Sequence, residues 1–189
     1  MATQDSRIKI KRSTVTTTVP TVPSSNDHTD GTWIATDIYK GELFYNQADG
    51  VLWSRDDKGV NCLSGSVAVT LSSAQVLALN TTPITLVGAV AGYAIEAVSV
   101  SVKLDYNSAA YATNTNLLII TDTATDPQYK RDSLLTQTAD AVWKFPVVNP
   151  TSGTQLIANK ALTASVVTGD PTAGDSPITI FVNYRLIPA

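Results

Sequence analysis

Residues with reactive or metal-binding side chains are few in this 189-residue sequence. His28 is the sole histidine, it lies in the polar stretch SSNDHTDGT, and no G-x-S-x-G or comparable nucleophile motif occurs elsewhere. Cys62 is the sole cysteine, which excludes an intrachain disulfide and a Cys/His zinc cluster by count. We therefore expect a solvated loop histidine and no enzymatic activity.

The acidic residues form no recognisable site either. Asp49, Asp56 and Asp57 lack the alternating oxygen ligands, central glycine and distal glutamate of an EF-hand loop. Glycosidase chemistry needs two facing carboxyl groups, and nothing in the sequence selects such a pair. No glycine-rich phosphate-binding motif is present. We expect turn aspartates, no metal ion and no cofactor. The other aspartates in turn contexts are Asp122, Asp126, Asp170 and Asp175.

Aromatic side chains offer the remaining binding chemistry. Trp33, Trp53 and Trp143, together with seven tyrosines, could stack on sugars or anchor a partner protein. Packing in a core or at a subunit interface is the alternative for each ring, because the sequence does not separate an exposed ring from a buried one. Both interpretations stay open at this stage.

The elements that must position these residues are mainly β-strands. In YKGELFYNQADGVLWSRDDKGV, two aromatic-rich runs, 42–45 and 51–54, flank a segment that ends in Asp49-Gly50. Aromatic and β-branched residues favour strands, and Asp-Gly tolerates the positive φ that a tight turn requires. The sequence therefore predicts a β-hairpin here, preceded by a strand in WIATDIY.

Charge and hydropathy exclude further classes of protein. The net charge of -3 and the isoelectric point of about 4.9 argue against a general nucleic-acid binder. No apolar run approaches the roughly 18 residues that cross a bilayer, and we find no secretion leader. We expect a soluble protein made without export, with no nucleic-acid or membrane partner. The dense basic cluster alternates with isoleucines, as on the wet face of a strand, and consists of Arg7, Lys9, Lys11 and Arg12.

Composition divides the chain near residue 64, where aromatic and charged residues give way to small and apolar ones. The Ser-Gly-Ser joint at 64–66 then separates a β module, residues 1–63, from a β-sandwich domain, residues 64–189. One short helix is predicted in LSSAQVLALNTTP, because Ser72 can cap its N-terminus and Gln75 can complete a capping box.

Alternating strands are predicted through the remainder of the chain. The final run, SPITIFVNYRLI, is apolar on both faces, which is usual for a strand that is central in its sheet or covered by a neighbour. At least six strands separated by polar, Gly or Pro turns predict an antiparallel β-sandwich, most simply of jelly-roll type. In EAVSVSVKLDY, the face expected to be buried carries Val98, Val100, Val102, Leu104 and Tyr106. The other runs are TPITLVGA, NLLIITD, AVWKFPVV and KALTASVVTG.

Two parts of the chain resemble known phage proteins. Residues 7–60, with IKIKRSTV, VP and YKGELFYNQADGVLWSRDDKGV, resemble the N-terminal module of tailed-bacteriophage fibres and appendages, where a basic strand precedes proline, GEL and a DG.L hairpin. The insertion SSNDHTDGTWIATDIY departs from that pattern. The second half is similar to a β-rich domain of phage and prophage virion proteins, including head fibres, through LN.TP..LV, YATNTNLLI, NKAL and GDPTAG.

The resemblance implies a non-enzymatic structural protein of the virion, made in the bacterial cytoplasm: a trimeric head fibre or capsid decoration. Its partners would be copies of itself and, through the N-terminal module, the capsid or other virion proteins. A tail-associated module that binds a receptor or host-surface glycans is the alternative. A module of about 60 residues without disulfide or metal gains stability by packing against copies of itself. The candidate contact residues are Phe44, Trp53 and Phe181.

Overall fold

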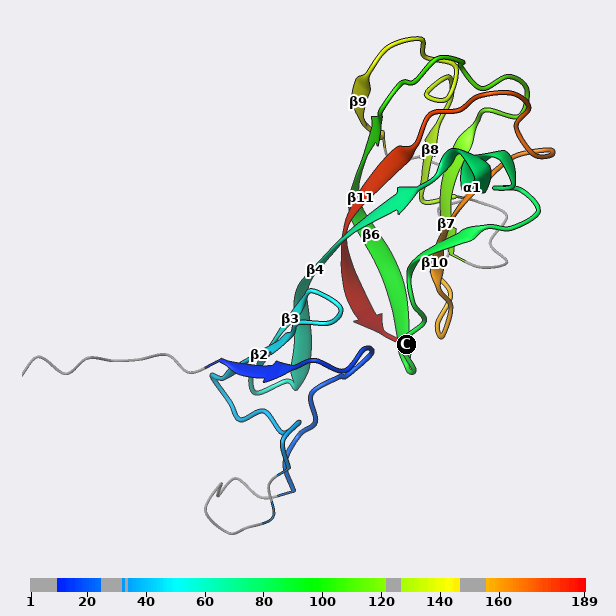
Figure 1. Cartoon of the computed structure of the whole chain (residues 1–189). Helices are drawn as coiled ribbons and strands as arrows, with labels where there is room; N and C mark the ends of the chain where they lie inside the picture. The colour runs from blue at the N-terminus through cyan, green and yellow to red at the C-terminus, as the bar shows by residue number, and fades with distance from the viewer. Residues whose placement is uncertain (1–9, 25–31, 33, 122–126, 147–155) are drawn as a thin grey trace, which may run out of the picture. The chain divides into compact units, whose positions relative to one another are not determined.

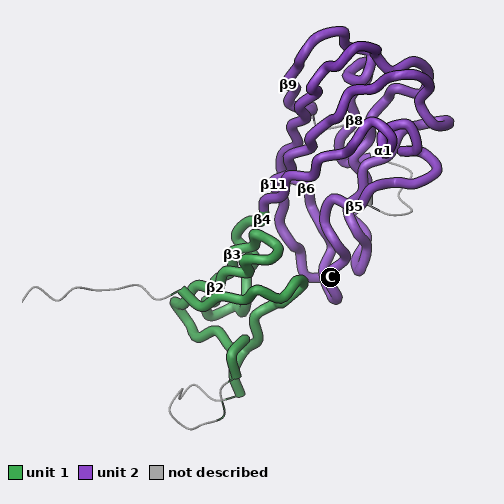
Figure 2. Tube along the Cα trace, viewed as in Figure 1, with its two compact units in different colours: residues 1–65 green, residues 66–189 purple. Residues whose placement is uncertain are grey.

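The computed structural model describes residues 10–24, 32, 34–121, 127–146 and 156–189. The chain divides into two compact units, residues 1–65 and 66–189 (Figure 2). Strands dominate both units, and the described residues hold one short helix (Figure 1). The predicted all-β sandwich with one short helix is therefore confirmed. The jelly-roll connectivity, and separate folding of residues 1–63 and 64–189, stay predictions.

The first unit is built on the predicted hairpin, which is confirmed. Within it the strand order is β1-β2-β3-β4, with β1 parallel to β2 and the other pairs antiparallel. Phe44 lies directly opposite Trp53 in the hairpin, and both rings are buried to 1% exposure. This pair forms the centre of a small core. The strands are β1 (Lys11–Ser13), β2 (Leu43–Asn46), β3 (Val51–Arg55) and the beginning of β4 (Val60–Leu71).

The prediction of a strand in WIATDIY is wrong for residues 34–39, the part of this run that the structure describes. Ile34 to Asp37 form a turn in which the Asp37 amide donates to the Ile34 carbonyl at 3.0 Å. The Asp37 carboxylate also accepts from the Ile34 amide at 2.9 Å, so the side chain closes the turn that the run of apolar residues conceals. Only an isolated bridge between Thr21 and Asp37 remains of the expected pairing in the described part of this segment.

The second unit is a sandwich of two sheets. The first, here called the β11 sheet, has the order β4-β11-β6-β9, and the second, the β10 sheet, has the order β5-β10-β7-β8. The final strand is central in its sheet, which is one of the two predicted alternatives, because it lies between β4 and β6. The strands are β5 (Ile84–Val87), β6 (Tyr93–Leu104), β7 (Leu117–Thr121), β8 (Tyr129–Arg131), β9 (Ala141–Lys144), β10 (Leu162–Val166) and β11 (Ile178–Pro188).

The core of the second unit lies between its two sheets. In β11 every second residue from Ile178 to Leu186 is buried, and the alternate residues lie on the opposite, outer face. The β10 sheet contributes buried aliphatic residues at matching alternate positions. The core residues from the paired strands β11 and β6 include Ile178, Ile180, Val182, Val100, Val102 and Leu104.

A β-bulge in β6 overturns one predicted face. Asn183 pairs with Ser99 but Tyr184 pairs with Ala97, so Val98 is an extra residue in the ladder. Val98 is 56% exposed, although strict alternation places it in the core beside Val100. The extra residue shifts the side-chain alternation by one position, and Ala97 takes the buried place instead.

The capping box is confirmed, and the expected joint at 64–66 has a different local structure. Helix α1 (Ser73–Leu77) starts at the N-cap Ser72, whose hydroxyl accepts from the Gln75 amide while the Gln75 side chain accepts from the Ser72 amide. Residues 64–66 lie inside strand β4, where a loop was expected. Small residues fit a strand as well as a linker, and here the strand pairing prevails.

Candidate functional site

The predicted turn aspartates act as clamps for backbone amides. Asp175 accepts from the amides of Ser108 and Ala109 at 3.1 and 2.9 Å, from the Ser108 hydroxyl at 2.6 Å and from Asn107 Nδ2 at 2.9 Å. These hydrogen bonds, led by that of the Ser108 side chain, lower the pKa of Asp175 to about 2. The carboxylate therefore ties two loops together as an anion.

Asp170 makes the same kind of clamp at the end of helix α1. It accepts from the amides of Asn80 and Thr81 at 2.7 and 3.0 Å and from the Thr81 hydroxyl at 2.9 Å. The hydrogen bonds to Thr81 are the main reason that its pKa is lowered. In the part of the chain that the structure describes, no cluster of His, Cys, Asp or Glu side chains is placed to hold a metal ion.

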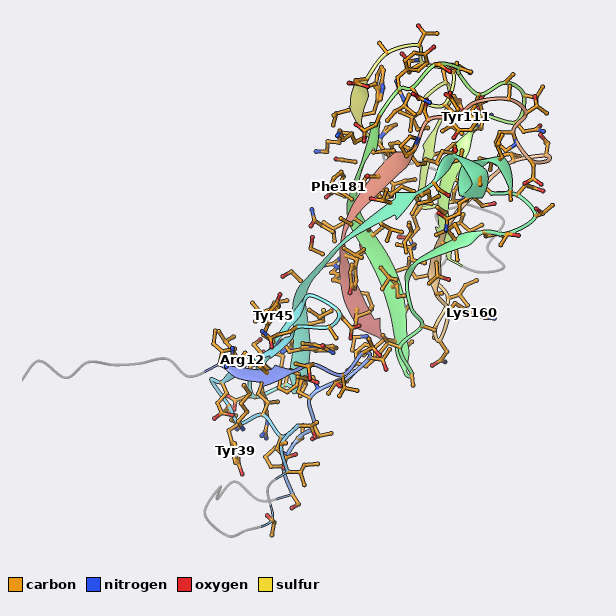
Figure 3. All side chains as sticks on the ribbon, viewed as in Figure 1. Arg12, Tyr39, Tyr45, Tyr111, Lys160 and Phe181 are labelled. Carbon is orange, nitrogen blue, oxygen red and sulfur yellow. The ribbon has the colours of Figure 1, made fainter. Side chains whose placement is uncertain are left out.

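Tyr111, labelled in Figure 3, packs against the loop that contains Gly174, Asp175 and Ser176. Its hydroxyl donates to the Ser176 carbonyl at 2.6 Å, and burial raises its pKa to about 12, so it stays a proton donor. A Cβ on Gly174 would lie 2.3 Å from the Tyr111 ring, and Gly174 has a φ of +88°. Glycine is therefore required at this position both by space and by backbone conformation.

In the first unit the hairpin turn is held by hydrogen bonds to residues that lie far from it in the sequence. Asn46 Nδ2 donates to the carbonyls of Val15 and Thr18 at 3.1 and 3.2 Å and to the Asp49 carboxylate at 2.7 Å. Asp49 also accepts from the Thr17 amide at 2.5 Å. The turn of the DG.L hairpin is thereby fastened to the segment that follows β1, across about thirty residues of sequence.

The three candidate contact rings occupy two kinds of position. Phe44 and Trp53 are buried within the first unit, which leaves almost no surface of either ring for a second copy in this conformation. Phe181 lies on the outer face of the β11 sheet and is 43% exposed (Figure 3). Contact of these residues with another copy stays a prediction, and Phe181 alone of the three offers surface for it.

The face that carries Phe181 has mainly polar side chains. The neighbour of Phe181 across the ladder is Ser101, which pairs in turn with Lys144. One row away, Thr179 pairs with Lys103, which pairs with Val142, a residue that is 72% exposed. The large apolar side chains that the described part of the second unit exposes are Val98, Val142 and Phe181, all carried by strands of the β11 sheet.

Two further interactions carried no sequence signal. The Arg131 guanidinium lies 4.0 Å from the centre of the Trp143 ring, which joins the edge strand β8 to the edge strand β9. Gln128 is buried beside β6 although glutamine is usually exposed. Both interactions connect different sheets, so spacing along the sequence could not reveal them. His28, Trp33, Asp122 and Asp126 lie outside the described residues, as does most of the basic cluster.

No helix among the described residues has the length and apolar character needed to cross a bilayer. No protein-family model matches the chain, and no curated protein matches it. A solved structure titled "Cyanophage Pam1 capsid asymmetric unit" is similar over 66% of this chain and 84% of its own, with 14% sequence identity and a TM-score of 0.38. At that TM-score the likeness carries no argument about function.

Proposed function

We propose that this chain is a non-enzymatic structural protein of a bacteriophage particle: a head fibre or capsid decoration that assembles as a homotrimer. The first unit attaches to the capsid or to another virion protein, and the second unit forms the projecting β-sandwich. The virion is then its place of action.

The observation that carries this proposal is the construction of the hairpin. The residues that resemble the fibre module, GEL and DG.L, surround a turn whose Asp49 and Asn46 are bound to the segment after β1. Such bracing holds the turn in one conformation, which suits an attachment element that must present a fixed surface. The same clamps on backbone amides at Asp170 and Asp175 give the second unit rigid loops.

Self-association of the second unit is supported by its outer face. Phe181 is a partly exposed ring on a face with serine, threonine and lysine side chains, a composition typical of a contact centre with a polar rim. Two further apolar side chains, Val98 and Val142, are exposed on strands of the same sheet. We propose that this face, with Phe181 at its centre, is the contact between copies.

Light scattering of the intact protein tests the oligomer. The chain has a mass of 20.0 kDa, so a trimer scatters as about three times that mass and a monomer as one. Phe181→Ser should raise the concentration at which half of the trimer dissociates by at least about ten-fold, because it removes a central apolar ring. Val15→Ser, at an exposed valine of the first unit, is the matched control and should leave this concentration unchanged. A wild-type mass near 20 kDa contradicts the oligomer.

Electron microscopy of virions with and without the chain tests the place of action. Density on the capsid that disappears with the chain supports the proposal, and density at the tail tip supports the second candidate, a receptor- or glycan-binding module. That candidate rests on the exposed aromatic ring of Phe181 and is tested by glycan-array binding. Binding that Phe181→Ser abolishes would favour it over the structural role.

A further inference from the structure

Strand β6 has one edge that faces away from β11, and the described residues pair with only part of this edge. On the side away from β11, β9 pairs only with Ser101 to Leu104. The Phe145 amide donates to the Val100 carbonyl and the Asn159 amide donates to the Tyr93 carbonyl, both at 2.9 Å. No strand of the described residues pairs with this edge between Ile95 and Val98.

Uncovered edge backbone is a hazard for a β protein. Its unpaired N–H and C=O groups can take up a strand from another molecule, which leads to aggregation. Strand β6 has twelve residues, and its ladder with β11 shifts at the bulge at Val98. The backbone groups at this place must therefore find other partners.

The Gln128 side chain supplies the missing partners. Its Oε1 accepts from the Ala97 amide at 2.7 Å, and its Nε2 donates to the Ile95 carbonyl at 2.9 Å. One side-chain amide thus offers the acceptor and the donor that the backbone C=O and N–H of one residue in a neighbouring strand would offer. Gln128 is only 6% exposed, so it also excludes water from these bonds.

The next residue completes the closure. The Tyr129 hydroxyl donates to the Val98 carbonyl at 2.6 Å, and burial raises its pKa, so the hydroxyl keeps its proton. The backbone of this segment is held by the opposite sheet, because the Gln128 amide donates to the Ile119 carbonyl at 2.9 Å and Tyr129 pairs with Ile119. Both side chains therefore reach β6 from a fixed base.

We propose that Gln128, assisted by Tyr129, closes the part of the β6 edge that no described strand pairs with, and prevents strand pairing with a second copy of this chain at Ile95 to Val98. This inference is independent of the proposed function.

Hydrogen exchange of the intact protein tests the closure. In the wild type, the Ala97 amide should exchange slowly although no described strand covers it. Gln128→Leu keeps the size of the side chain but removes both hydrogen bonds, and it should speed exchange at Ala97 by at least about ten-fold while β11 amides keep their rates. Gln47→Leu, at an exposed glutamine of the first unit, is the matched control and should change nothing. Rapid exchange of Ala97 in the wild type overturns the proposal, whether or not the variant folds.

Self-association distinguishes an opened edge from a general loss of stability. Gln128→Leu should form larger species than the wild type in light scattering at about 100 µM. Adding Val98→Lys places a charge on the same edge and should restore the wild-type mass, because lysine on an edge strand opposes pairing. A Gln128→Leu mass equal to that of the wild type, or an increase that Val98→Lys does not reverse, overturns the proposal.

Discussion

The two units solve the problem of burial in different ways. Phe44 and Phe181 both lie inside antiparallel ladders, yet one is 1% exposed and the other 43%. The first unit is small, so its hairpin must bury the Phe44–Trp53 pair to obtain a core at all. The second unit fills its core between two sheets and can leave a ring on the outer face. The exposed ring of Phe181 is therefore a candidate contact residue, because the core of the larger unit does not need it.

Removing the central ring of the smaller core should have the largest effect. Trp53→Ala leaves a large cavity beside Phe44 and should lower the free energy of unfolding of the first unit by about 3–5 kcal/mol. Hydrogen exchange of the β2 and β3 amides measures this loss. Val15→Ala is the control and should cost less than about 1 kcal/mol, since this side chain is 65% exposed. Continued protection of β2 and β3 in Trp53→Ala would contradict a core centred on this pair.

Glycine substitutions compare the packing of the two units at positions with similar backbone conformation. Gly174 and Gly41 have φ values of +88° and +81°, but a Cβ meets the Tyr111 ring only at Gly174 and meets nothing within 4 Å at Gly41. Gly41→Ala should therefore cost about 1 kcal/mol from backbone strain. Gly174→Ala should cost about 2–4 kcal/mol because it adds overpacking against a buried ring. Urea unfolding measures both, and equal losses would show that Tyr111 moves aside freely.

Acid should weaken the loops of the second unit through Asp175. A carboxylate whose pKa is lowered to about 2 in the folded chain stabilises it above the unfolded value of about 3.9, and this stabilisation disappears as the pH falls toward 2. Asp175→Asn should reduce stability at pH 7 and flatten the decline between about pH 4 and 2. Urea midpoints measured across this range provide the test. Asp57→Asn, at an exposed aspartate of the first unit that pairs with Lys40, is the control. If Asp175→Asn has the same acid profile as the wild type, the ionised Asp175 carboxylate does not stabilise the folded chain.

Local sequence was sufficient where neighbours in the chain decide the structure. The hairpin around Asp49-Gly50 and the capping box of Ser72 and Gln75 depend on residues within a few positions of one another, and both were predicted. The strand prediction for WIATDIY failed because its apolar residues follow a strand pattern, whereas the Asp37 side chain accepts from the Ile34 amide and closes a turn. Alternation placed Val98 in the core because a bulge leaves no mark in the spacing of residues.

The candidate surface was predictable only in part. Three aromatic residues could be nominated, but their exposure depends on which strand covers them. Phe44 and Trp53 are each 1% exposed, whereas Phe181 lies on the outer face of its sheet and is 43% exposed. Gln128 could not be nominated at all, since its partners lie more than thirty residues away in another sheet.

By itself the sequence determined the class of fold, the position of the single predicted helix and the scarcity of catalytic groups, because propensity and alternation are properties of neighbouring residues. Tertiary structure alone decided which apolar side chains stay exposed, where the ladder of β6 shifts and which side chain closes its edge. Those outcomes depend on hydrogen bonds between segments far apart in the chain, and a strand has a free edge or a free face only with respect to the strands that pack beside it.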